Sequence, residues 1–159
     1  MSRLYQIQEA VRQRAEEIAA IHGNWPCRKG CDDCCRHLAS VPKITREEWE
    51  RIVAALDRLP AEAADQALCR IRGCHSQPSI CPLLDLDTGS CLVYEARPLA
   101  CRAYGFYAER ESVLGCHRIE SIAAECPDVV WGNHAALEDR LSSLGPSADL
   151  WEWLNREAR

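Results

Sequence analysis

The sequence predicts a mainly α-helical fold with one small β-hairpin. Apolar residues recur every three or four positions near the start of the chain and again over residues 45–59, as on one face of a helix. Residues 83–95 instead form two short apolar runs around a turn sequence, which favours a hairpin. With 159 residues, the chain has room for one domain. We therefore expect a single domain over residues 1–159.

The first predicted helix covers residues 4–22 and ends before Gly23 and Pro26. Arg, Gln and Glu occupy most of its remaining positions, so one face is apolar and the other polar. The predicted apolar face consists of Leu4, Ile7, Val11, Ala15, Ile18 and His22.

A second helix is predicted after a short extended segment at residues 38–44. Thr45 can cap its start, and Glu48 three residues later completes a capping box. Pro60 then begins a short Ala-rich helix that reaches about Cys69, and residues 71–80 are expected to form a loop. The buried stripe of the second helix is predicted to be Trp49, Ile52, Val53, Leu56 and Leu59.

The last part of the chain is predicted to alternate between turns and short helices. Residues 87–90 form the turn of the hairpin, and a short turn or helix follows Pro98. Asn133 is expected to cap a helix over residues 134–144. Ser147 is expected to cap a final helix that carries Leu150, Trp151 and Leu154, in which Trp151 and Trp153 cannot share one face.

Charge and hydropathy exclude several classes of protein. Nineteen Lys and Arg against 24 Asp and Glu give a net charge of −5, so no nucleic-acid partner is expected. The N-terminal segment is charged throughout and lacks the apolar region of a signal peptide. No apolar run approaches the length of a membrane span. We expect a cytoplasmic protein without a membrane partner, and the sequence identifies no protein partner.

The eleven cysteines are the main functional clue. Disulfides are disfavoured in a reducing compartment, and an odd number of cysteines cannot pair completely within one chain. A cysteine-dense intracellular domain more often holds a metal ion or cluster. We therefore expect the small domain to be stapled by cysteine-bound metal, with redox thiols and inert buried cysteines as alternatives.

The cysteines fall into two sets. The first set has spacings of four, three and one residues, which bring three thiols together either on a helix face or in a loop that turns at Gly30. Adjacent cysteines rarely both bind one ion, so one of its last two could serve a second site. The second set is more dispersed, and the hairpin can bring its first two members together. The first set is Cys27, Cys31, Cys34 and Cys35, and the second is Cys81, Cys91, Cys101 and Cys116.

This pattern resembles the YkgJ-like cysteine-cluster family, which is described as a zinc- or iron-chelating domain. The resemblance rests on CRKGCDDCC at residues 27–35, CPL at 81–83, and CLVYEARPLACR at 91–102, and it covers about residues 24–118. A related domain occurs in flagellin lysine N-methylases, which are linked to an iron–sulfur cluster. The resemblance implies that Arg97 and Pro98 shape the last loop. It implies a metal-binding set of Cys27, Cys31, Cys34, Cys35, Cys81, Cys91 and Cys101.

Three functions remain open on the sequence. The first is a structural or stored metal held by cysteines, and the second is an iron–sulfur enzyme acting in redox or methyl transfer. The third is a thiol redox protein, so enzymatic activity is undecided. Zinc and iron–sulfur clusters both accept four thiolates, and histidine nitrogens could add to them. The residues left without a predicted role are Cys69, Cys74, Cys126, His22, His37, His75, His117 and His134, of which His75 and His117 are the best candidate nitrogen ligands because each follows a cysteine.

Overall fold

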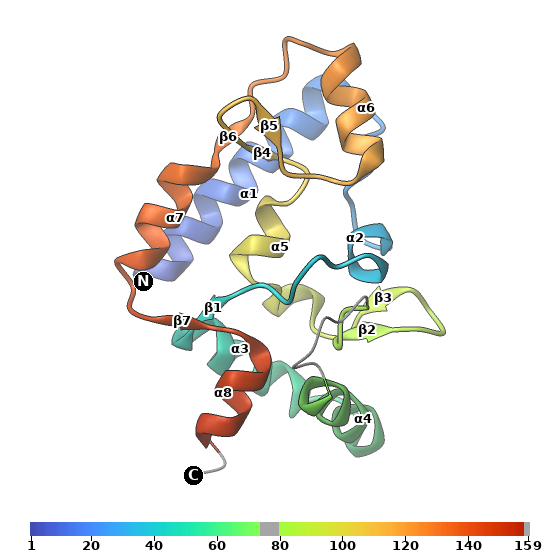
Figure 1. Ribbon diagram of the computed structural model, residues 1–159, viewed down its shortest axis with the longest axis vertical. Coiled ribbons are helices and arrows are strands. Elements are labelled where there is room, and N and C mark those ends of the chain that lie inside the picture. The colour runs from blue at the N-terminus through green and yellow to red at the C-terminus, as the bar shows by residue number, and fades with distance from the viewer. Residues whose placement is uncertain (74–79, 158–159) are drawn as a thin grey trace. The chain divides into compact units, whose positions relative to one another are not determined.

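The computed structural model describes residues 1–73 and 80–157, and its helices and strands are labelled in Figure 1. The chain divides into a first unit, Met1–Arg28 with Leu99–Gly145, and a second unit, Lys29–Pro98 with Pro146–Arg159. Helices predominate among the described residues and the strands are only two or three residues long, which confirms the predicted fold class. None of the described helices combines the length and the apolar character needed to span a membrane.

The first unit begins with the long helix α1, Arg3–His22. The Tyr5 N–H donates to the Ser2 hydroxyl at its start, and Gly23, with a φ of 55°, ends it by donating its N–H to the Ala19 carbonyl. The predicted boundaries are therefore confirmed. The buried positions of α1 are Leu4, Ile7, Val11 and Ile18, all members of the predicted apolar face.

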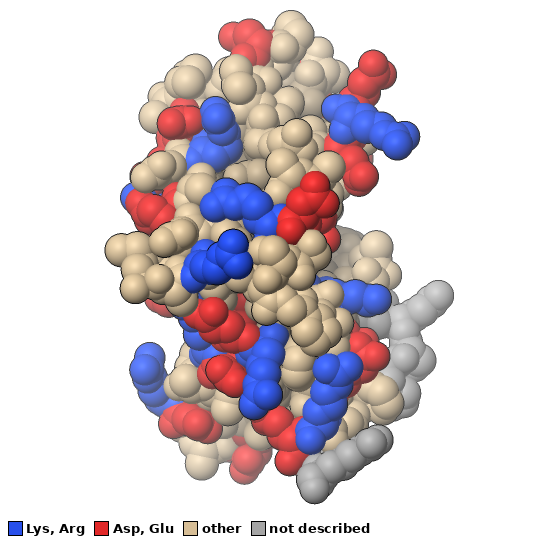
Figure 2. Space-filling model, turned by 90° about the vertical axis from the view of Figure 1, so that its left-hand side faces the viewer, with Lys and Arg blue, Asp and Glu red and all other residues tan. Residues whose placement is uncertain are grey.

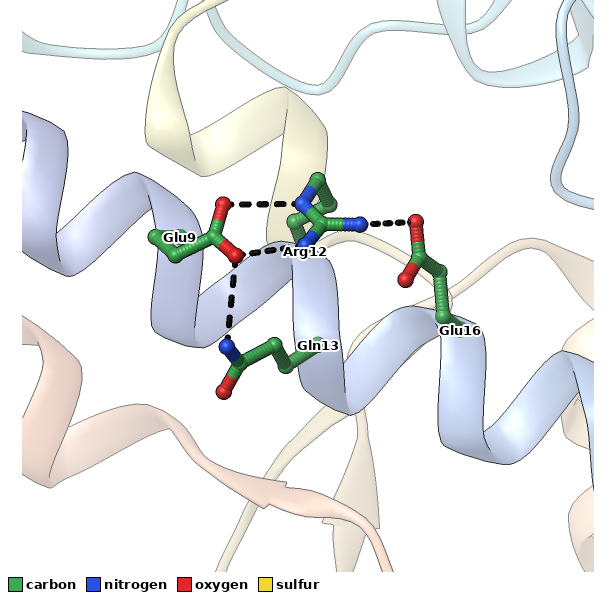
Figure 3. A network of polar contacts seen from close by, with 4 residues as sticks. All are labelled: Glu9, Arg12, Gln13 and Glu16. Carbon is green, nitrogen blue, oxygen red and sulfur yellow. Dashed lines mark hydrogen bonds and ion pairs between the residues drawn. The ribbon is translucent and has the colours of Figure 1, made fainter.

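The solvent face of α1 carries a chain of ion pairs (Figure 3). Arg12 donates to the carboxylates of Glu9 and Glu16, one turn away on either side, and Gln13 also donates to Glu9 at 3.2 Å. The Arg12 hydrogen bonds lower the pKa of Glu9, whose side chain stays in solvent. Exposed pairs of this spacing contribute only about 0.3–0.5 kcal/mol each, so α1 depends mainly on its buried face.

Short elements complete the first unit. The helix α5, Leu99–Ala103, packs against α1. A three-stranded sheet pairs β4, Tyr107–Glu109, with the antiparallel β5, Ser112–Val113, and with the parallel β6, Gly132–Asn133. Two further helices are α6, His117–Glu125, and α7, His134–Ser142. The sequence predicted neither this sheet nor α6, because strands this short show no apolar period.

Aromatic rings fill the core of the first unit. The Trp25 Nε1–H donates to the Gly105 carbonyl at 3.2 Å, and the Trp25 ring lies 6.0 Å from Phe106 and 5.7 Å from Trp131 between centroids. The predicted cap of α7 is confirmed, because the Asn133 side chain accepts from the Ala136 N–H at 3.0 Å. The helix ends at Ser142, two residues before the predicted boundary. This core is closed by ordinary apolar packing.

The second unit is organised around α3, Arg46–Leu56. The predicted capping box is present: the Glu48 N–H donates to the Thr45 hydroxyl, and Glu48 accepts from the Thr45 N–H at 2.8 Å. The extended segment before it is shorter than predicted, with only β1, Ile44–Thr45, in a strand. Of the predicted stripe, Trp49, Ile52 and Leu56 are buried, while Val53 and Leu59 are half-buried.

The two other long helices of this unit are α4, Ala61–Arg72, and α8, Leu150–Glu157, which pack against each other. The Ala-rich helix thus runs three residues past its predicted end, into the predicted loop. The predicted cap at Ser147 is wrong, because Ser147 lies in β7, Ser147–Ala148, which pairs with β1. Asp149 caps α8 instead, accepting from the Glu152 N–H at 2.8 Å and donating its own N–H to Glu152 at 3.0 Å.

The two tryptophans of α8 lie on different faces, as predicted. Trp153 is buried and its Nε1–H donates to the Ile44 carbonyl at 2.9 Å, whereas Trp151 is 36% exposed. On the face drawn in Figure 2, acidic and basic side chains are interspersed and neither sign forms a broad patch.

Candidate metal centre

Two segments of the second unit bring cysteines together. The short helix α2, Asp33–Arg36, carries Cys34 and Cys35. The Cys81 N–H donates to the Cys35 carbonyl at 2.7 Å, which places the chain before the hairpin beside the end of α2. The backbone itself therefore holds Cys35 and Cys81 next to each other, before any interaction between their sulfurs is considered.

The predicted hairpin is confirmed, with β2, Leu84–Asp85, antiparallel to β3, Ser90–Cys91. Leu84 pairs with Cys91, and the Leu84 N–H donates back to the Cys81 carbonyl at 3.1 Å. Cys81 is thus bonded to the direct cross-strand neighbour of Cys91. This geometry agrees with the expectation that the hairpin brings Cys81 and Cys91 together.

The hairpin turn is fixed by its own side chains. The Asp85 carboxylate accepts from the N–H groups of Asp87 and Thr88 at 3.0 and 3.3 Å, which together with the Thr88 side chain lowers the pKa of Asp85. Gly89 has a φ of 67°, and a Cβ there would lie 2.9 Å from the Asp32 carboxylate that precedes α2. The turn therefore needs glycine both for its conformation and for its close approach to Asp32.

An arginine from α4 anchors the start of the hairpin. The Arg70 Nε–H donates to the Pro82 carbonyl at 2.9 Å, directly after Cys81. No pattern in the sequence singles out Arg70, because one arginine on a helix face usually points into solvent. The turn itself was predicted from residues 87–90, but the Asp85 side chain that fixes it was not, although Asp is typical of such turns.

Three thiols of this unit form a hydrogen-bonded chain. Side-chain hydrogen bonds link Cys34 with Cys35, and Cys35 with Cys81. The bond to Cys35, together with burial, raises the pKa of Cys34. For Cys35, the bond from Cys34 lowers the pKa, but the bond to Cys81, burial and the charges of Cys81 and Cys91 outweigh it and raise the pKa to about 12.

The fourth thiol of the group is Cys91. Burial raises its pKa, while the Arg97 guanidinium acts in the opposite direction and favours the thiolate. Arg97 is held in place because its Nε–H donates to the Tyr94 carbonyl at 3.0 Å and its guanidinium stacks 3.6 Å from the centre of the Tyr94 ring. The charge of Cys34 also raises the pKa of Cys91.

We call Cys34, Cys35, Cys81 and Cys91 the thiol group. Its sulfurs interact in pairs. Among the described residues, no three of these sulfurs all lie within 4.8 Å of one another. Both adjacent cysteines, Cys34 and Cys35, belong to it, and the expectation that one of them serves a second site or is only structural stays a prediction. The four thiols are soft donors, they are half-buried, and the Arg97 guanidinium acts on Cys91. Such a set of donors fits zinc or an iron–sulfur cluster better than a harder metal.

The other cysteines of the predicted set occupy different places. Cys31 is a half-buried residue of the second unit, two residues before α2. Cys101 lies in α5 of the first unit, and Cys116 precedes α6 there. The Cys27 sulfur, also in the first unit, lies 2.2 Å from the position that a Cβ on Gly105 would take. Cys27 and Cys116 pack against the apolar core of that unit.

The remaining cysteines and histidines have varied surroundings. Cys126 packs against the core of the first unit and Cys69 is exposed on α4. The His22 ring lies 5.8 Å from Trp25, the His37 Nδ1 is 3.0 Å from the Asp33 carbonyl, and the His134 Nε2 is 3.9 Å from Glu138. His117 is the first residue of α6. Cys74 and His75 lie outside the described residues.

Comparison with known proteins gives one assignment. No curated protein matched the sequence, and no solved structure matched the chain. Residues 26–127 match the model of the CxxCxxCC family, described as a "putative zinc- or iron-chelating domain". This range includes the thiol group, together with Cys27, Cys31, Cys101 and Cys116. The match covers well over half of the chain and confirms the resemblance inferred from the cysteine pattern, and we conclude that the chain belongs to the CxxCxxCC family.

Proposed function

We propose that the thiol group binds zinc or iron, and that the bound metal holds the segments around α2 and the β2–β3 hairpin together. The observation that supports this most is the hydrogen-bonded chain from Cys34 through Cys35 to Cys81. The charge of Cys34 also raises the pKa of Cys91, so the fourth thiol interacts with this chain electrostatically. Four thiolates give zinc a closed tetrahedral shell with Zn–S distances of about 2.3 Å.

The environment supports thiolate binding. Four thiolates around Zn²⁺ carry an excess charge of about −2, which a partly buried site must offset. The pKa of Cys91 is raised by burial, but the charge of Arg97 opposes this rise and favours the thiolate, and Tyr94 fixes the position of Arg97. Thiols whose pKa is raised are protonated at neutral pH, so metal binding would release protons. Rotation of the side chains would close the shell, because the backbone already holds the four residues together.

Further ligands are proposed from the sequence. Cys27, Cys31 and Cys101 follow from the family resemblance and Cys116 from the second set of cysteines, and they complete the proposed metal-binding set. Together with the thiol group, they supply more cysteines than one tetrahedral ion needs. This excess supports a second site or a multinuclear one. We also propose a cytoplasmic location, on the argument that free thiols in this number suit a reducing compartment.

The main alternative is an iron–sulfur enzyme in redox or methyl transfer, as in the related domain of flagellin lysine methylases. One observation favours it: Cys91 lines an open hollow next to Tyr94, where a substrate could approach a cluster. A thiol redox protein is the second alternative, because Cys35 and Cys81 are already hydrogen-bonded and could form a disulfide.

Metal analysis distinguishes these functions. The protein would be purified without oxygen, and its zinc, iron and acid-labile sulfide measured on one sample together with its visible spectrum. We expect at least one metal per chain. Colourless protein with zinc supports the structural role, whereas iron with equivalent sulfide and a brown colour supports the enzyme. Protein with neither metal and with all thiols titratable would contradict metal binding and favour the redox function.

A further inference from the structure

A hollow of about 500 Å³ opens in the second unit where η1, Tyr94–Ala96, packs beside α3. Its size lies within the range of sites that bind small molecules. The hollow is lined by Lys29, Arg51, Ala54, Ala55, Arg58 and the residues from Cys91 to Ala96.

The α3 side of the hollow follows from the sequence. Arg51, Ala54, Ala55 and Arg58 have spacings of three, one and three residues, so they share one helical face that continues into the turn after α3. Two alanines between two arginines leave a gap, because a methyl side chain does not fill the space that a longer side chain would. The opposite wall includes Leu92, Val93 and Tyr94, so the interior is mostly apolar.

The rim of the hollow carries more positive than negative charge. Three of its lining residues are basic and one, Glu95, is acidic, in a chain whose net charge is −5. Lys29 lies 3.9 Å from Glu95, but both side chains are largely exposed, so this pair is weak. Arg51 is paired with Glu47 at 2.8 Å. In the part of the chain that the structure describes, no carboxylate lies within 4.0 Å of Arg58 that would neutralise it.

We propose that this hollow binds a small organic anion with an apolar body and a single carboxylate. The apolar body rests on Ala54 and Ala55 and faces Val93 and Tyr94, while the carboxylate pairs with Arg58. Arginine suits this role because its planar guanidinium can donate two parallel hydrogen bonds to one carboxylate. The site does not require a metal in the thiol group, although Cys91 places the bound anion beside that group.

The test uses the full chain as purified and two probes, 2-naphthoate and the uncharged 2-naphthalenemethanol, titrated by calorimetry at low salt. We expect saturable binding of one naphthoate per chain and much weaker binding of the alcohol. Arg58→Gln should weaken naphthoate binding about 10-fold, since it removes the charge and the paired donors that hold the carboxylate. Ala54→Leu, at an exposed position, should fill the hollow and weaken binding of both probes.

Arg46→Gln is the control, because Arg46 lies on α3, which forms one wall of the hollow, but does not itself line the hollow. It should leave binding within about 2-fold of the original. The proposal is overturned if naphthoate shows no saturable binding, or if Arg46→Gln weakens binding as much as Arg58→Gln does. Neither outcome would bear on metal binding, which is measured separately.

Discussion

Cysteines in the two units of the chain have different neighbours. In the first unit, Cys27, Cys116 and Cys126 pack against a core of leucine, isoleucine and aromatic side chains. In the second unit, Cys81 and Cys91 also pack against an apolar core, but the cysteines of the thiol group interact with one another as well, on or beside elements of two to four residues. Apolar burial suffices to hold a helix such as α1 in place, whereas elements this short need another source of stability. The comparison indicates that a metal matters most for the second unit.

The largest expected effect is loss of a ligand from the thiol group. Cys35→Ser or Cys81→Ser should reduce metal affinity by more than about 100-fold, because even residues behind the ligands contribute 10- to 100-fold. Metal content after purification and the melting temperature should both fall.

Cys69→Ser is the control for these variants, because Cys69 is an exposed thiol of the same unit. It should keep the original metal content and melting temperature. Equal metal content in Cys35→Ser, Cys81→Ser and Cys69→Ser would show that the thiol group is not the metal site.

Removing the metal should affect the two units unequally. In the second unit, the N–H groups of Cys81, Leu84 and Leu92 make hydrogen bonds of 2.7, 3.1 and 2.9 Å within the hairpin and its link to α2. Hydrogen exchange at these amides should speed up by roughly 10-fold or more after chelation. Amides in the middle of α1 should keep their protection. If hydrogen exchange sped up equally in both units, the metal would not stabilise the second unit more than the first.

A substitution in the first unit should lower stability through backbone strain and steric overlap alone. Gly105 has a φ of 87°, and a Cβ there would lie 2.2 Å from the Cys27 sulfur. Gly105→Ala should therefore reduce the free energy of unfolding by about 2–4 kcal/mol, from the disfavoured φ and the overlap together. Urea unfolding measures this.

Gly23→Ala provides the matched comparison, since Gly23 has a φ of 55° and nothing within 4 Å of its Cβ position. It should lose only the part that arises from the backbone. Metal content should stay unchanged in Gly105→Ala if the thiol group alone binds the first metal. Loss of metal in this variant, with Gly23→Ala unaffected, would instead assign Cys27 a role in binding it.

The smallest expected effect is a pH dependence of the metal-free protein. Folding raises the pKa of Cys35 from 9.0 to about 12, and that of Cys34 also rises. A raised pKa means that the folded chain binds the proton more tightly, so the contribution to stability is present below pH 9 and is lost as the pH rises towards 12. Urea unfolding of reduced, metal-free protein should show a lower free energy at pH 10.5 than at pH 8, and Cys35→Ser should reduce the difference. An unchanged free energy would contradict the shift, whereas metal-loaded protein should lose stability on acidification instead.

Sequence periodicity predicted the longer helices well because each buries a continuous apolar face. It located α1, the capping box of α3, the Asn133 cap and the hairpin. It failed at Ser147, where pairing of β7 with β1 removes the residue from the helix start and Asp149 takes over the cap. It also missed the strands of the first unit, whose short length leaves no period to detect, and α6, which has no side-chain cap like that of Asn133 at the start of α7.

The candidate site was predictable as residue types but not as contacts. Spacing and family resemblance identified Cys34, Cys35, Cys81 and Cys91. That Cys34 and Cys35 share one group depends on the Cys81–Cys35 backbone bond, which links positions 46 residues apart and leaves no local trace in the sequence. The hollow beside α3 is lined by residues of α3 and of η1, and only the fold places these two elements together.

Cysteine labelling is the most direct test that the thiol group binds metal. Reduced protein would be treated with an alkylating reagent with and without bound zinc, and the modification of each cysteine measured by mass spectrometry. We expect that zinc protects Cys34, Cys35, Cys81 and Cys91, while Cys69 is modified equally in both samples. If zinc binds but leaves these four cysteines as reactive as in the metal-free protein, the thiol group is not the metal site.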